Sequence, residues 1–110
     1  MSNIENEFYD CISELVEYYR RFRSKTRLEI ADVLGVREDY IRKIHSLGSD
    51  KRYSSKHLFL LSSFLGVSVS DLYPTVENLT KLEKYRGLDV EKRREIIEQF
   101  KNGLRKEEEG

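Results

Sequence analysis

Apolar residues recur at three- and four-residue steps along most of the chain, which is the spacing of one face of a helix. The first such stripe, between Glu5 and Phe22, comprises Phe8, Cys11, Ile12, Leu15, Tyr18, Tyr19 and Phe22. The sequence contains no sustained alternation of apolar and polar residues, the pattern typical of strands. It therefore predicts an all-α fold that begins with a long helix.

Two shorter helices, joined by a glycine, should follow. Thr26 and Glu29 have the spacing of a capping box, in which each side chain bonds the backbone amide of the other residue. The helix that they begin should end at Leu34, because Gly35 permits a left-handed turn. The apolar period restarts after this glycine, with Val36, Ile41 and Ile44. Two helices joined by a short turn that contains glycine form a helix-turn-helix motif.

A fourth helix should begin at Ser54 or Ser55, after a polar loop. Its apolar positions are Leu58, Leu61, Phe64 and Leu65. Ser68 and Asp71 repeat the capping-box spacing ahead of a short fifth helix, which should close before Pro74. The chain up to this proline is predicted to form one compact five-helix domain.

Residues 75–110 are predicted to form a helical extension of the domain over residues 1–74. A short helix with Val76, Leu79, Leu82 and Tyr85 should precede a charged final helix that is capped by Asp89 and ends in a frayed, disordered tail. The final helix carries a narrow apolar stripe of Ile97, Phe100 and Leu104. Such a stripe must be covered, either by a second copy as a dimerisation element or by the first helix of the same chain.

Charge and composition narrow the class of protein. The chain has 20 basic and 20 acidic residues and a net charge of zero, which removes the simplest argument for a nucleic-acid partner. Residues 24–57, which contain the helix-turn-helix, carry eight basic and five acidic side chains and form the only net positive segment. The single cysteine, Cys11, and the lack of a secretory or membrane-spanning pattern predict a cytoplasmic protein. We expect neither a metal nor a cofactor, and no enzyme, because no catalytic constellation is recognisable.

The stretch "TRLEIADVLGVREDYIRKI", followed by "LFLLSSFLGVSVSDLYP", resembles the Cro-like (XRE-type) phage-repressor helix-turn-helix family. The resemblance covers residues 8–73 and implies a five-helix repressor-like DNA-binding domain that acts as a dimer on inverted repeats in double-stranded DNA. The chain departs from the family at Arg27, where glutamine is usual, and at Arg37, where serine or threonine is usual. The loop from His45 to Tyr53 is also about two residues longer. The target sequence therefore cannot be inferred from the family.

The resemblance places the second helix of the motif in the major groove, where its residues would read base edges. The residues expected to read bases are Arg37, Glu38, Asp39, Arg42 and Lys43. The residues expected to contact phosphate are Lys25, Arg27, Tyr40, Lys51, Arg52 and Lys56. Two acids at the start of a recognition helix have two explanations: they accept hydrogen bonds from cytosine N4, or they complement the helix dipole whatever the helix binds.

Two functions remain open on the sequence alone. The first is a sequence-specific transcriptional regulator, most simply a repressor. The second is a protein-interaction module, such as an antitoxin or a regulator adapter, that presents its C-terminal helices to a protein partner. Convergence of Arg27, Arg42, Lys43, Lys51 and Arg52 on one face would favour DNA.

Overall fold

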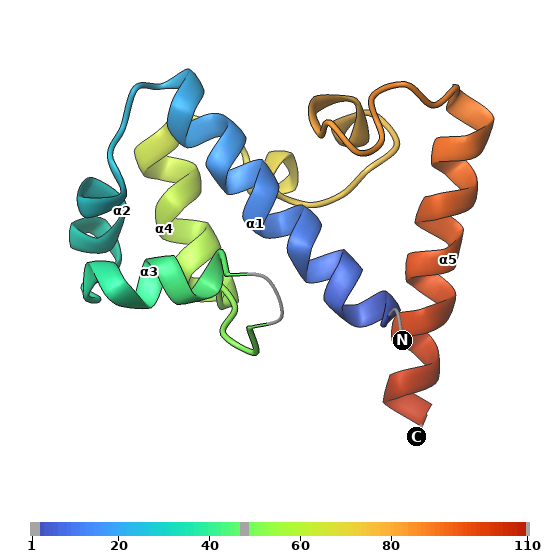
Figure 1. Ribbon diagram of the computed structural model, residues 1–110, viewed down its shortest axis with the longest axis horizontal. Helices are drawn as coiled ribbons and strands as arrows, with labels where there is room; N and C mark the ends of the chain where they lie inside the picture. Colours follow the sequence, from blue (N-terminus) through green and yellow to red (C-terminus); the bar gives the residue numbers. More distant parts are fainter. Residues whose placement is uncertain (1–2, 47–48, 110) are drawn as a thin grey trace.

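The computed structural model describes residues 3–46 and 49–109, and consists of five α-helices and two 3₁₀ helices (Figure 1). The α-helices are α1 (Ile4–Phe22), α2 (Arg27–Leu34), α3 (Glu38–Ile44), α4 (Ser55–Leu65) and α5 (Val90–Glu109). The 3₁₀ helices are η1 (Val69–Leu72) and η2 (Asn78–Lys81). No strand occurs among these described residues, which confirms the all-α prediction.

The predicted helix boundaries follow from the caps. The Thr26 hydroxyl accepts a hydrogen bond from the Glu29 amide at 3.0 Å, and the Glu29 carboxylate accepts one from the Thr26 amide at 2.9 Å. Gly35 ends α2 with a φ of 70°, a left-handed conformation that costs glycine little. Ser54 begins α4 in the same way, with the His57 ring in place of the usual acid.

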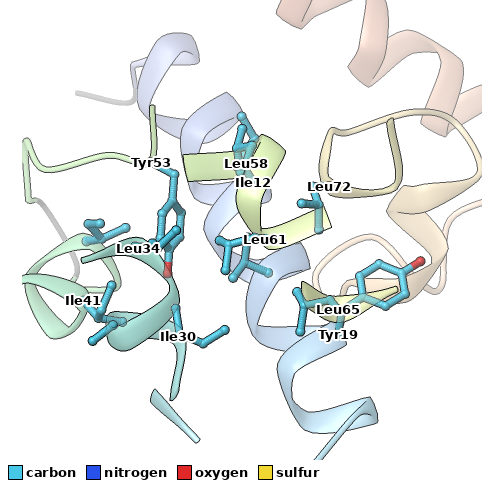
Figure 2. Packing of buried hydrophobic residues seen from close by; sticks show 13 residues of the cluster. Ile12, Tyr19, Ile30, Leu34, Ile41, Tyr53, Leu58, Leu61, Leu65 and Leu72 are labelled. Atoms are coloured by element: carbon cyan, nitrogen blue, oxygen red, sulfur yellow. The ribbon is translucent and has the colours of Figure 1, made fainter. Parts of the chain in front are cut away.

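The helix-turn-helix belongs to a core that α1, α2, α3, α4 and η1 build together (Figure 2). Its most deeply buried members are Ile12, Val16, Ile30, Ala31, Ile41, Leu58, Leu61, Leu65 and Leu72. The small Ala31 side chain is buried where α2 meets its neighbours. The Tyr53 ring, directed inward beside Leu34, is almost fully buried as well (Figure 2). This core fixes the position of α3 chiefly through Ile41 and Ile44, with Tyr40 packed partly against it.

A second cluster joins the extension to α1. Its buried members are Cys11, Leu15, Leu79, Leu82, Tyr85 and Phe100. Cys11 is 2% exposed, and burial raises the pKa of its thiol to about 12. The thiol lies 3.9 Å from the Tyr85 hydroxyl. α1 therefore contributes to both clusters, and the extension packs on the domain.

The short helix predicted over Val76 to Tyr85 is only partly formed. Only the single 3₁₀ turn η2 forms there, although Leu79, Leu82 and Tyr85 are buried as expected. The segment is held by Asn78, whose side-chain amide donates hydrogen bonds to the carbonyls of Ser70 and Tyr73 at 2.9 and 2.8 Å. These bonds tie the segment to η1 and to the turn that follows it.

α5 packs against α1 over its C-terminal half, and the two helices approach closely at Gly103. A Cβ atom at Gly103 would lie 2.4 Å from Cγ2 of Ile4, so only glycine fits without a shift. Asp89 caps α5 by accepting a hydrogen bond from the Lys92 amide at 2.9 Å. The backbone of α5 is helical to Glu109, and the side chains of the predicted tail beyond residue 105 lie outside the described part of the chain.

Candidate nucleic-acid interface

α3 presents a charged face opposite its buried one. At about 100° per residue, positions 38, 39, 42 and 43 project away from Ile41 and Ile44, which are buried. Glu38, Arg42 and Lys43 are exposed, and Asp39 is partly exposed. The structure thus brings four of the five predicted base-reading residues onto one surface, and the fifth, Arg37, immediately precedes the helix.

Arg37 begins α3 without capping it. Its side chain makes no hydrogen bond to the first turn of the helix, and its Nε lies 3.2 Å from a carboxylate oxygen of Asp39. The Arg37 side chain is 90% exposed, so this ion pair contributes little to stability. The pair does neutralise one of the two acids at the start of α3, and both acids also face the positive end of the helix dipole.

The residues predicted to contact phosphate differ in how exposed they are. Lys51 and Lys56 are exposed. The Lys25 ammonium lies 5.0 Å from the centre of the Phe64 ring, and Tyr40 is half-buried against the first core. These four residues therefore divide into two exposed lysines and two residues that pack on the domain itself.

Arg52 is engaged by α1. Its guanidinium donates hydrogen bonds to Glu5 and Asn6, each at 2.6 Å, and lies 4.1 Å from the centre of the Tyr9 ring. The pairing of Arg52 with Glu5 joins the loop before α4 to the N-terminal half of α1. Arg52 thus serves first to hold this loop in place.

Arg27 also faces α1, where it lies 3.8 Å from Glu17. The Glu17 carboxylate accepts two hydrogen bonds from Arg20 and one from Arg21 as well. The bonds from Arg20 chiefly hold the pKa of Glu17 at about 2, well below its ordinary 4.5. Arg27 is the most distant of these partners, and 39% of its side chain remains exposed.

His45 ends α3 and packs on the domain. Its Nε2 lies 2.7 Å from the Tyr53 hydroxyl, and burial lowers the pKa of the ring to about 4. His45 is therefore neutral at pH 7. Among the described residues, no three His, Cys, Asp or Glu side chains are grouped so that they could hold a metal ion.

The apolar stripe of α5 packs on α1 of the same chain, the second of the two alternatives. Phe100 is 3% exposed and belongs to the second cluster, and Ile97 packs partly against the same cluster. Leu104 is half-buried. Phe100 therefore offers no surface to a second copy in this arrangement. None of the described helices is long and apolar enough to cross a bilayer.

One feature of the surface differs from the sequence prediction. Phe22, assigned to the buried stripe of α1, is 65% exposed and stacks on Tyr18, with ring centres 6.3 Å apart. Position 22 lies at the end of α1, where the chain turns through Ser24 with a φ of 56°. Apolar periodicity alone could not reveal this, because the stripe continues one turn past the elements that cover it.

No family model, curated protein or solved structure matches this chain. The likeness to Cro-like repressors therefore rests on the motifs of the sequence.

Proposed function

We propose that this protein binds double-stranded DNA sequence-specifically through α3, and acts in the cytoplasm as a transcriptional regulator, most simply a repressor. The observation that carries the proposal is the outer face of α3. Arg42 and Lys43 project from it, Ile41 and Ile44 anchor the opposite side, and α2 supports the helix across the Gly35 turn. An α-helix presented in this way fits the major groove.

Each residue of the α3 surface has a chemical role in this proposal. Arg42 and Lys43 donate to guanine O6 and N7, and Glu38 accepts from cytosine N4. Asp39 is already paired with Arg37, so it reads a base only if Arg37 turns to a phosphate. The acids also repel phosphates and unsuitable bases, which lowers affinity for non-specific DNA.

Sequence-independent contacts are proposed for Lys51, Lys56 and the exposed part of Arg27. Because Arg52 is held by Glu5 and Asn6, it orders the loop that carries Lys51. So few phosphate contacts make a single copy a weak binder, and a homodimer on an inverted repeat is part of the proposal.

The test is selection from a random DNA pool at two salt concentrations. The full chain is compared with Arg42→Ala plus Lys43→Ala, and with the control Lys92→Ala plus Arg105→Ala on the exposed side of α5. The α3 variant should lose the selected motif, and the control should retain it. Lys51→Gln plus Lys56→Gln should weaken binding to all sequences alike and reduce the salt slope by about 2 per bound copy.

Absence of DNA binding at low salt would overturn the proposal. So would equal losses for the α3 variant and the α5 control, because binding would then depend on charge alone.

A second candidate function is a protein-interaction module, in the manner of an antitoxin or regulator adapter. The observation in its favour is that Arg27 and Arg52, both expected at DNA phosphates, face carboxylates of α1 instead. In this case the C-terminal helices would present the partner surface. A chain that selects no DNA and co-purifies in a defined complex with a protein encoded beside it would support this candidate.

A further inference from the structure

An open cleft of about 960 Å³ lies along one face of α1, and neither candidate function accounts for it. The start of α2 and the end of α3 contribute residues to it, as does the segment over residues 81–86. In Figure 1, α2 and α3 lie to one side of α1, and the segment that contains η2 lies to the other. Binding sites for small molecules commonly have volumes of about 300–1,000 Å³.

The apolar part of the lining is a pair of aromatic rings. Tyr18 and Phe22 stand one helical turn apart with their ring planes 13° from parallel, and Phe22 is largely exposed. The only other apolar residue of the lining is Leu82, which is itself buried. A partner helix would need several apolar contacts spaced over two turns, so this small ring surface is better matched to one flat ring.

The charged part of the lining has an excess of cations. Its basic residues are Arg21, Arg27, Lys81, Lys84 and Arg86, and its acidic residues are Glu14, Glu17 and Glu83. Glu17 is already occupied by Arg20, Arg21 and Arg27. Among the described residues, Lys81 and Arg86 form no ion pair with a carboxylate, so their charges are open to an anion.

We propose that this cleft binds a small organic anion that carries a flat aromatic ring. The ring would lie against Phe22, and the anionic group would meet Lys81 and Arg86. A nucleotide phosphate and an aryl carboxylate share this chemistry. The proposal does not depend on DNA binding, because the α3 face and the cleft share none of the residues predicted to read bases.

The test is a titration of the isotope-labelled full chain, followed by amide chemical shifts. Two complete probes, adenosine 5′-monophosphate and 2-naphthoate, carry both an aromatic ring and an anionic group. Two partial probes carry one feature each: adenosine has the ring, and inorganic phosphate has the charge. At least one complete probe should bind at least tenfold more tightly than either half, with shifts centred on residues 14–22 and 81–86. Whether the phosphate or the carboxylate probe binds identifies the anion.

Two charge-removing variants distinguish binding in the cleft from non-specific attraction to basic residues. Lys81→Gln plus Arg86→Gln should weaken the complete probe at least tenfold, and the matched pair Lys92→Gln plus Arg105→Gln should leave it unchanged. All four side chains are at least partly exposed, so these variants should fold.

Three results would overturn the proposal: no shift in the cleft at millimolar probe, equal losses in both double variants, or tighter binding of a ten-residue glutamate peptide than of either complete probe. The last result would identify a docking surface for an acidic protein.

Discussion

Glu17 connects α1, the start of α2 and the basic residues around the cleft through one carboxylate. It is 16% exposed, and four hydrogen bonds or ion pairs with three arginines converge on it. The sequence contains the i,i+3 and i,i+4 spacing of Glu17 with Arg20 and Arg21, a pattern that predicts exposed pairs of little value. The carboxylate is also partly buried, which the spacing does not reveal, so its ion pairs contribute more to stability than exposed pairs do.

We predict that Glu17 makes stability depend on pH. Because its folded pKa of about 2 is below the ordinary 4.5, the stabilisation is complete above pH 4.5 and is lost as the pH falls toward 2. The shift corresponds to at most about 3 kcal/mol. Glu17→Gln should therefore lower the free energy of unfolding at pH 7 and flatten its decline between pH 4.5 and 2, as measured by urea denaturation.

Glu91→Gln is the control for Glu17, because Glu91 pairs with Arg94 at an exposed site. It should change the free energy of unfolding by less than about 0.5 kcal/mol. An unchanged acid dependence in Glu17→Gln would contradict the account of this carboxylate.

Individual elements were largely predictable where the signal is local. Thr26, Gly35, Ser54 and Ser68 set boundaries through bonds to residues three or four positions away, and the helices begin and end where these residues indicate. The segment around Asn78 was not predictable in the same way, because its hydrogen bonds run to Ser70 and Tyr73 outside its own turn. Apolar periodicity carries no information about such bonds.

The close contact between α1 and α5 makes stability sensitive to the residue at position 103. Alanine is favoured over glycine within a helix by about 1 kcal/mol, so Gly103→Ala would stabilise an isolated α5. In this fold it should destabilise instead, because the new Cβ would meet Ile4. The loss should become smaller in an Ile4→Ala background, which removes Cγ2 but keeps the Cβ atom that lies 2.8 Å from the added carbon. Thermal unfolding of the four chains of a double-mutant cycle would measure this difference.

Asn102→Ala serves as the neighbouring control for Gly103, since Asn102 is exposed on the same helix. It should be neutral or slightly stabilising. A stabilising Gly103→Ala in the unmodified chain would mean that α1 and α5 can separate without cost.

In the molecule as a whole, α1 forms part of both hydrophobic clusters. We therefore predict that a substitution that disrupts the second cluster lowers the stability of the whole fold. Phe100→Ala should cost about 3–5 kcal/mol and raise the rate at which a thiol reagent labels Cys11 by at least tenfold, because the buried Phe100 side chain helps to cover that thiol. Phe59→Ala, which removes a ring that is 69% exposed, should leave the rate unchanged.

Coincident unfolding by tyrosine absorbance and by Cys11 labelling would confirm that the two clusters are coupled. Separate transitions would contradict it.

The placement of α3 and α5 bears on any dimer. The molecule measures 37 × 31 × 21 Å, and α3 and α5 lie toward opposite ends of its longest axis (Figure 1). Two copies that met through the outer side of α5 would hold their α3 helices up to about 74 Å apart, twice that axis. Half-sites one turn of DNA apart need about 34 Å, so such a dimer suits a separation of two turns.

The sequence could not predict this geometry or the cleft. Arg52 and Glu5 are 47 positions apart, and nothing local to either residue indicates their pairing. The exposed side of α3 could be predicted because a helix of seven consecutive residues, with Ile41 and Ile44 buried, determines it locally. The surroundings of Arg27 and Arg52 were not, because they depend on how α1 crosses the other helices.

Because α1 belongs to both hydrophobic clusters, the two clusters are completed at different times during synthesis of the chain. The first cluster needs nothing beyond η1, so it can form once the first seventy or so residues have left the ribosome. Leu79, Leu82 and Tyr85 can cover Cys11 and Leu15 only in part, and the second cluster is complete only once Phe100 has left the ribosome. During that interval the apolar side of α1 is open to chaperones and to other nascent chains, and α5 is the segment that ends this exposure.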